Sequence, residues 1–334
     1  MSLFKFFKSK KESQSISELA LDYDNLPVMT ADELIKFTEQ QNRIRRIKRI
    51  IKMDDERFKI LYLDVIYRFA ELVQLMPASQ AHHHAVPGGL FIHTLEVIEY
   101  AMNIRQQYKL PAFAEQEVQE RERHVWTYAI FVAALLHDVG KRVTMCDFMV
   151  DGKIYSAFED RFLSETGYKN YKIVFNNPKY HHLHDQIGLT FSDLLPELGR
   201  KFIFSHLNIV KEMSAYIHND KFNSGMIGEI ISQADQRSTG ESLAHTPTRK
   251  FKGATLENVG ERLMTQLRLM IASNDFVINK PNANIYTSEN GFTYCVSKVI
   301  VDAIREHLQK NNETDIPTDN NRIFDIFQEY GFAE

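Results

Sequence analysis

Residues 126–141 read WTYAIFVAALLHDVGK, an apolar run that ends in His137, Asp138 and Gly140. The run predicts a buried helix that ends near Gly140, with His137 and Asp138 at the end of that helix. An aspartate in such a place costs free energy unless it is paired or bound to a cation. A His-Asp pair alone occurs often by chance, so its meaning depends on the rest of the chain.

Two other polar residues interrupt apolar helical patterns. His93 lies in the middle of LFIHTLEVI, and Asp235 lies at the predicted end of the helix IGEIISQADQRS. Alone, a buried histidine is usually a satisfied core residue and a buried aspartate a cap or an ion-pair partner. Together, His93, His137, Asp138 and Asp235 predict one metal site. Imidazole and carboxylate suit Mn, Fe, Co, Zn or Mg, and these ligand types do not determine which of them is bound. We expect a divalent cation, with manganese first among them.

Further histidines lie near these residues in the sequence. Residues 77–95 read PASQAHHHAVPGGLFIHTL, so three consecutive histidines precede the Gly88-Gly89 break and His93 follows it. Residues 180–185 read YHHLHD, in which His181 and His184 share one face if the segment is helical. Such a pair can bind a second metal or a phosphate, and a surface cluster without a role is the alternative. Lys141 either reaches a phosphate oxygen from the helix end or is a solvated cap.

This pattern resembles a known superfamily. His93, His137, Asp138 and Asp235 resemble the H…HD…D signature of the HD superfamily of metal-dependent phosphohydrolases. These proteins are all-α, and their metals activate a water that attacks a phosphate ester. The string from Gln74 to Leu95, with its triple histidine and Gly-Gly, is similar to the N-terminal signature of the MobH-type conjugative relaxases, whose relaxase domain is also described as a helicase domain. The similarity continues through YHHLHD to ADQRS and covers residues 30–240.

The resemblance implies a role for each cluster. His93, His137, Asp138 and Asp235 would hold one ion, and His181 and His184 would hold a second ion or the scissile phosphate. His83 and His84, folded back toward His93 by the Gly-Gly break, would orient the phosphate or act as a general acid, and Lys141 would assist them. No nucleophile can be identified among the 14 tyrosines from the sequence.

Most of the chain between residues 30 and 235 has the periodicity of helices, including one around Leu163. Residues 146–158 form either a small hairpin around Asp151-Gly152 or an irregular loop. Residues 236–255 are polar and predict a linker or an exposed loop. We therefore expect a mainly α protein, with an N-terminal tail at 1–29, an HD-type helical bundle at 30–240 and a C-terminal module at 241–334. In that module, strands around Asn290-Gly291 followed by a helix indicate either a winged-helix-like α+β fold or a cap on the bundle.

Composition narrows the class of protein. The chain has 334 residues, of which 44% are hydrophobic, and no apolar run long enough to span a membrane. Two cysteines far apart indicate a reducing compartment, and we expect a cytoplasmic protein with no membrane partner. The oligomeric state is not predicted.

Positive charge is concentrated in two segments although the formal net charge is −4. Residues 41–59 predict an amphipathic helix with a basic face. A second basic segment lies in the predicted linker. The residues expected to contact nucleic-acid phosphates are Arg45, Arg46, Arg49, Arg249, Lys250 and Lys252. A solvated surface is the alternative for the basic helix.

Three functions follow from these residues. The first is a metal-dependent phosphodiesterase acting on DNA, either a relaxase-like nickase or a single-strand nuclease linked to mobile elements. The second is an HD-type nucleotide phosphohydrolase, which needs no basic segments. The third is a non-catalytic accessory protein of DNA mobilisation, which the complete set of histidines and aspartates disfavours.

Overall fold

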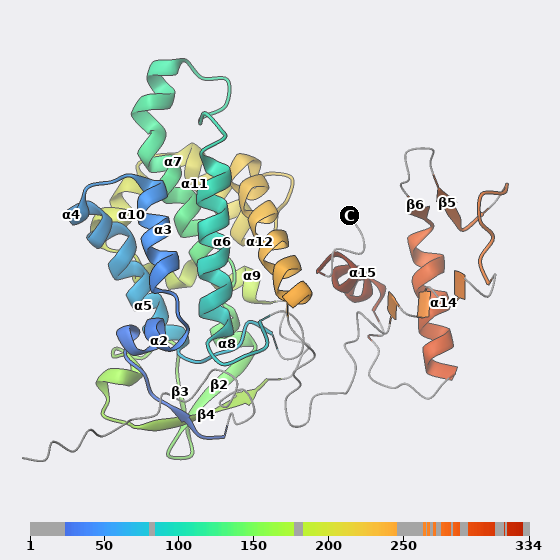
Figure 1. Ribbon diagram of the computed structural model, residues 1–334, viewed down its shortest axis with the longest axis horizontal. Coiled ribbons are helices and arrows are strands. Elements are labelled where there is room, and N and C mark those ends of the chain that lie inside the picture. Colours follow the sequence, from blue (N-terminus) through green and yellow to red (C-terminus); the bar gives the residue numbers. More distant parts are fainter. Residues whose placement is uncertain are drawn as a thin grey trace, which may run out of the picture. The chain divides into compact units, whose positions relative to one another are not determined.

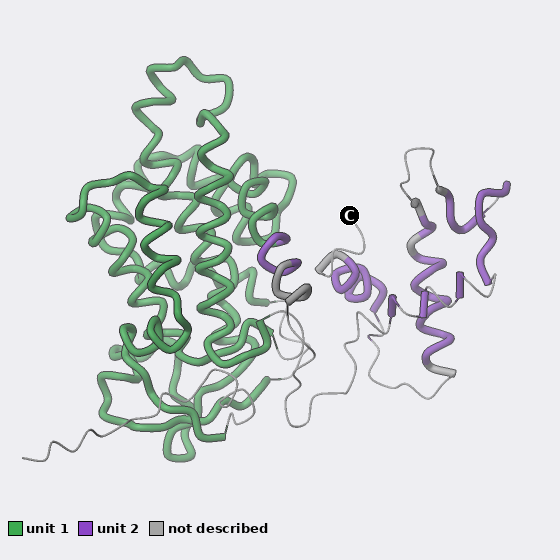
Figure 2. Tube along the Cα trace, in the orientation of Figure 1, with its two compact units in different colours: residues 1–80, 84–235 green, residues 81–83, 236–334 purple. Residues whose placement is uncertain are grey.

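The structure is a computed structural model that describes residues 24–79, 84–176 and 183–245, and residues 263–329 with gaps (Figure 1). The chain divides into two compact units (Figure 2). Unit 1 comprises residues 1–80 and 84–235, and unit 2 comprises residues 81–83 and 236–334. The four predicted metal ligands all lie in unit 1.

Unit 1 is built around helix α7 (Gln116–Leu136), which ends in the apolar run described above. Every residue from Val125 to Leu136 is buried, as expected for a helix that is apolar on all sides. α6 (Gly89–Arg105), α10 (Glu197–Phe204) and α11 (Leu207–Ile217) pack against α7. The end of α7 is therefore enclosed by other helices, and the polar residues that follow it face into the unit.

The N-terminal helices cover the outer side of α6. α2 (Ala31–Phe37) starts with a capping box formed by Thr30 and Glu33, and α3 (Gln41–Ile51) packs directly on α6. α4 (Asp55–Phe58), the π-helical segment η1 (Lys59–Leu63) and α5 (Asp64–Val73) continue as one helical run. This confirms the predicted amphipathic basic helix over residues 41–51 only, since Lys52 has a positive φ of 54° and the helix does not continue to residue 59. The helix predicted after it is confirmed as far as Val73.

A four-stranded antiparallel sheet lies at one end of the bundle (Figure 1). Its order is β1 (Leu26–Pro27), β4 (Asn170–Phe175), β2 (Cys146–Val150) and β3 (Lys153–Tyr155). β2 and β3 are the predicted hairpin, and Asp151 and Gly152 have positive φ angles of 49° and 77°, as its two-residue turn requires. The predicted helix around Leu163 is limited to the short 3-10 helix η2 (Leu163–Glu165), and Gly167 just after it has a positive φ of 86°.

The remaining elements of unit 1 carry the predicted site residues. α8 (Lys141–Thr144) follows the turn after α7, and α9 (His184–Ile187) continues into the 3-10 helix η4 (Gly188–Leu194). α12 (Gly225–His245) buries Ile227, Ile230, Ile231 and Ala234 on one face. The sequence predicts that this helix ends at Asp235 and that the next segment starts at residue 236. Both predictions were wrong, because α12 continues to His245. No proline occurs between Gly225 and Pro247, and Gly240 alone does not end a helix.

Unit 2 has its own small core. β5 (Ile285–Thr287) and β6 (Thr293–Cys295) form an antiparallel pair, followed by α14 (Ser297–Lys310) and α15 (Asn320–Glu329). Ile285, Ile300, Ile304 and Ile323 belong to one buried cluster. The expectation of a mainly helical protein with a small sheet is confirmed, and the winged-helix likeness stays a prediction. Within the described residues, no helix is both long and apolar enough to cross a membrane.

Candidate metal centre

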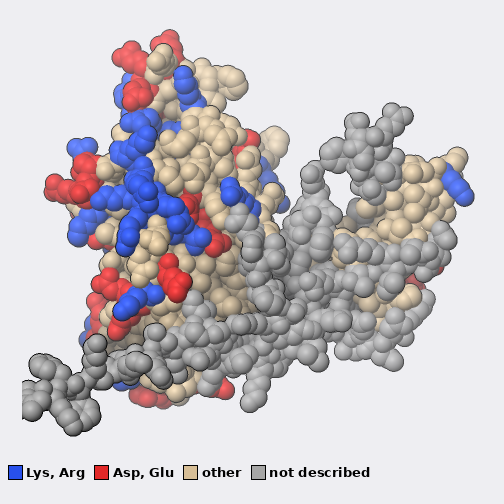
Figure 3. All heavy atoms as spheres, viewed as in Figure 1, with Lys and Arg blue, Asp and Glu red and all other residues tan. Residues whose placement is uncertain are grey.

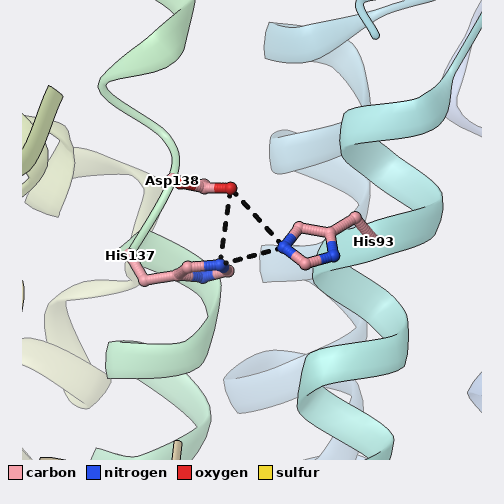
Figure 4. Close-up of side chains that lie close together, drawn as sticks. All are labelled: His93, His137 and Asp138. Atoms are coloured by element: carbon pink, nitrogen blue, oxygen red, sulfur yellow. Dashed lines mark hydrogen bonds and ion pairs between the residues drawn. The ribbon is translucent and has the colours of Figure 1, made fainter. Parts of the chain in front are cut away.

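Three elements of unit 1 bring the predicted metal ligands together. His93 lies in the middle of α6, His137 and Asp138 directly follow α7, and Asp235 lies within α12. Figure 4 shows the rings of His93 and His137 and the carboxylate of Asp138 pointing toward one another. The ligand atoms of these three residues lie within 4.8 Å of one another, so the group could hold a metal ion.

The distances place His93 Nε2 at the centre of the group. It lies 3.4 Å from His137 Nε2, 3.5 Å from Asp138 Oδ2 and 3.1 Å from Asp235 Oδ1. His137 Nε2 lies 3.5 Å from the same oxygen of Asp138. Two imidazole nitrogens and one carboxylate oxygen therefore face one small volume, and Asp235 lies beside it in contact with His93.

The hydrogen bonds and ionisation of these side chains suit a cation. His137 Nδ1 donates to the Ala134 carbonyl at 2.7 Å, which leaves Nε2 as the nitrogen that faces the group. Burial lowers the pKa of His93 and so favours its neutral ring. Burial alone would raise the pKa of Asp138, but the charges of Lys141 and the surrounding histidines hold it well below the usual range. Neutral imidazoles and an ionised carboxylate are the states in which these groups bind metals.

The carboxylate of Asp138 requires a cation because it is almost completely buried. Asp138 is 5% exposed and His93 is 1% exposed. Lys141 Nζ lies 2.7 Å from Asp138 Oδ2, on the oxygen that also faces both imidazoles. Lys141 is thus paired with Asp138 and not a solvated cap, and its contact with a phosphate oxygen stays a prediction.

The second oxygen of Asp138 faces another pair of residues. His184 Nε2 lies 3.6 Å from Asp138 Oδ1 and 2.9 Å from Asp185 Oδ1. Burial disfavours the charged ring of His184, but the hydrogen bond to Asp185 and the charge of Asp138 raise its pKa above the usual value. His184 is the first residue of α9, and His181 lies outside the described residues, so their predicted shared helical face stays untested.

A close backbone contact holds this segment against the end of α7. A methyl group on Gly140 would lie 2.3 Å from the carbonyl oxygen of His184, which only a glycine at this position permits. The approach of His184 to Asp138 therefore depends on the glycine of the HDVGK string.

His84 adjoins the same group from the chain before α6. Its ring centroid lies 5.1 Å from that of His93, and its Nε2 lies 2.9 Å from Glu96 Oε2. His84 has a positive φ of 48°, and a methyl group on Gly89 would lie 1.9 Å from its carbonyl oxygen. The Gly-Gly break thus places His84 beside His93, as predicted, while His83 lies outside the described residues.

Tyr216 of α11 is another residue in the electrostatic surroundings of the group. Burial, together with the charges of Asp235, Asp138 and Asp185, raises the pKa of Tyr216 well above its usual value. Its hydroxyl group therefore stays protonated and can donate a hydrogen bond.

The basic helix α3 uses its arginines in two ways. Arg43 and Arg46 face α6, where Arg43 Nε lies 3.0 Å and Arg46 Nη2 lies 2.9 Å from Glu99 Oε2. Arg45 and Arg49 are exposed, and lysine and arginine side chains gather on this face of unit 1 (Figure 3). Arg46 is half-exposed beside its carboxylate partner. Arg249, Lys250 and Lys252 lie outside the described residues.

A comparison with protein families matches residues 26–334 to the family TraI_2, described as "Putative helicase". The chain belongs to this family. The match confirms the predicted resemblance to a family related to the conjugative relaxases. The matched residues include every residue of the metal centre. A search of curated proteins finds no match to the chain.

Asp185, Glu96 and Tyr216 are neighbours of the site that the sequence analysis did not identify. Asp185 follows His184 and so forms a second His-Asp pair in the chain, a signal equal to that of residues 137 and 138. Glu96 is a charged residue one helical turn after His93 in an apolar helix. Tyr216 carries no such signal, because only the packing of α11 brings it near the carboxylates.

Proposed function

We propose that the chain is a metal-dependent phosphodiesterase that cleaves DNA, as a relaxase-like nickase or a single-strand nuclease linked to mobile elements. The observation that carries this proposal is the grouping of His93, His137 and Asp138, whose ligand atoms lie within 4.8 Å of one another, with Asp235 Oδ1 3.1 Å from His93 Nε2. Membership of the family described as "Putative helicase" supports a nucleic-acid substrate.

These four residues fit a divalent cation of the manganese, magnesium, iron, cobalt or zinc type. When bound, such an ion lowers the pKa of a coordinated water and neutralises charge on a phosphate. The oxygens of Asp138 face two sets of donors, since Oδ2 faces His93 and His137 while Oδ1 faces His184. We infer that His184 and Asp185 mark a second position, for another ion or for the scissile phosphate.

Other residues of the chain would act on the substrate. Lys141 carries a positive charge into a buried position beside Asp138, where it can contact a phosphate oxygen. His84 can orient the phosphate or protonate the leaving oxygen from its place beside His93. Tyr216, kept protonated, can donate a hydrogen bond but is not poised as a phenolate nucleophile.

The exposed face of α3 supports a polynucleotide over a free nucleotide. Arg45 and Arg49 present exposed charges on α3 in addition to the metal pocket, and the phosphates of a polynucleotide could contact them. Binding through such charges weakens as the salt concentration rises, because bound phosphates release counterions. An HD-type nucleotide phosphohydrolase would have no use for this face.

The test is a cleavage assay with several substrates. The purified chain is incubated with Mn²⁺ or Mg²⁺ and labelled single-stranded DNA, duplex DNA, RNA or deoxynucleoside triphosphates, beside Asp138→Ala. The control is Asp160→Asn, which removes the negative charge of an exposed aspartate. We expect cleavage of single-stranded DNA by the wild type and Asp160→Asn but not by Asp138→Ala. Cleavage of triphosphates alone would contradict the DNA substrate, and activity of Asp138→Ala would contradict the site.

A further inference from the structure

A chain of ion pairs runs from the basic helix α3 to the metal pocket. Arg46 and Arg43 both contact Glu99, and Arg43 Nη2 also lies 3.1 Å from Glu96 Oε1. The other oxygen of Glu96, Oε2, lies 2.9 Å from His84 Nε2. Glu96 thus uses one oxygen for the arginine of α3 and the other for the histidine beside His93.

The position of His84 is unusually constrained. Its positive φ of 48° is disfavoured for a residue with a β-carbon, and its carbonyl oxygen contacts Gly89 so closely that no side chain fits there. Its side chain is 7% exposed, and that of Glu96 is 15% exposed. A strained backbone that its surroundings hold in place is characteristic of functional positions.

From these contacts, we propose that Glu96 and Arg43 are positioning residues that hold the His84 imidazole beside His93, in the orientation in which it meets the substrate phosphate. Glu96 accepts the hydrogen bond from Nε2 and so determines which ring nitrogen carries the proton. Arg43 fixes the carboxylate from the opposite side. This inference rests on the proposed function for the role of His84, but the placement of the ring can be tested without it.

The inference separates two arginines of the same helix. Arg43 is turned toward α6 and its side chain is only 16% exposed, so it serves the pocket. Arg45 lies on the exposed face of α3, which in the proposed function binds DNA phosphates. Loss of Arg43 should lower kcat and leave DNA affinity and its salt dependence unchanged, whereas loss of Arg45 should weaken DNA binding and reduce its salt dependence.

The first measurement concerns the ring itself. The full chain is labelled with ¹⁵N-histidine, and the ring nitrogens of His84 are observed by NMR without added metal, with His84→Gln to assign the signal. We expect the wild type to show a proton on Nε2, Glu96→Gln to retain this tautomer through its amide oxygen, and Glu96→Ala to show a mixture. An unchanged His84 signal in Glu96→Ala would overturn the proposal.

The second measurement concerns catalysis. We expect Glu96→Ala to lower kcat by about 10- to 100-fold, with KM unchanged, and Glu96→Gln to recover most of the loss. The control is Glu71→Ala, which removes another partly buried glutamate that accepts hydrogen bonds from Ala31 and Ser164. If Glu96→Ala loses no more kcat than Glu71→Ala, the Arg43–Glu96 pair only joins α3 to α6 and the positioning role is refuted.

The two measurements separate the inference from the proposed function. A wild type that cleaves no DNA contradicts the proposed function, while a tautomer change in Glu96→Ala would still support the placement of His84 by Glu96. A wild type that cleaves DNA, with an unchanged tautomer and kcat in Glu96→Ala, contradicts the inference alone.

Discussion

Replacement of Gly140 by alanine tests the role of the close contact between α9 and the turn that joins α7 to α8. The added methyl group would lie 2.3 Å from the His184 carbonyl oxygen and 2.9 Å from its carbonyl carbon and Cα. The φ of Gly140 is −59°, which alanine adopts without strain, so the steric contact is the main perturbation. The backbone of His184 must therefore move away from the end of α7.

The size of the effect follows from this displacement. Restoring an ordinary van der Waals contact requires the carbonyl of His184 to retreat by roughly 1 Å. This movement would carry His184 Nε2 away from Asp138 Oδ1, from which it now lies 3.6 Å. A misplacement of about 1 Å at a catalytic group can reduce the rate about 100-fold, or about 2.7 kcal/mol of activation free energy. Overpacking should also lower the free energy of unfolding by about 1–3 kcal/mol.

The assay compares kcat for DNA cleavage with the rise in melting temperature on addition of Mn²⁺. We expect Gly140→Ala to lose kcat but to retain a rise in melting temperature, because His93, His137 and Asp235 are unaffected. Gly240→Ala is the control, since its methyl group meets no heavy atom within 4 Å, and it should stabilise α12 by up to about 1 kcal/mol. A kcat for Gly140→Ala equal to that of Gly240→Ala would refute the reasoning.

Three other predictions concern binding and stability. Mn²⁺ at 100 times its dissociation constant for the wild type should stabilise the wild type by about 2.7 kcal/mol in thermal unfolding. An equal gain in Asp235→Ala at the same Mn²⁺ concentration would exclude Asp235 as a ligand. Burial raises the pKa of Glu99, but hydrogen bonds from Arg46 and Arg43 bring this pKa below its usual value. The contribution of Glu99 to the free energy of unfolding is therefore present above the unfolded-state pKa and is lost as the pH falls through the folded-state pKa. Urea unfolding should therefore show Glu99→Gln about 1–2 kcal/mol less stable than the wild type at neutral pH, a difference that disappears at acidic pH; a constant difference would argue against the ion pair. Ile47→Ala, which removes a fully buried side chain of α3, should cost about 2–5 kcal/mol in the same assay, and a cost near zero would contradict that packing.

Elements whose pattern is local were predictable from the sequence. The apolar run of α7, the alternating bases and isoleucines of α3, and the Asp151-Gly152 turn each specify their own backbone over a few residues. Where a signal was weak, prediction failed, as for the extent of the helix around Leu163 and the end of α12. The sheet as a whole could not be predicted, since β1 pairs Leu26 with Tyr171, and these two residues are far apart in the sequence.

The chemistry of the candidate site was also partly contained in the sequence. His93, His137, Asp138 and Asp235 are polar residues in apolar helices, where burial without a partner is costly, so their types alone indicated a cation. The tertiary structure decided their geometry and partners. Only the packing of α6, α7 and α12 brings His93 within 3.1 Å of Asp235, and only the contact at Gly140 directs His184 to the second oxygen of Asp138. The sequence determines which polar side chains are costly to bury, while the fold determines which of them are buried in contact with one another.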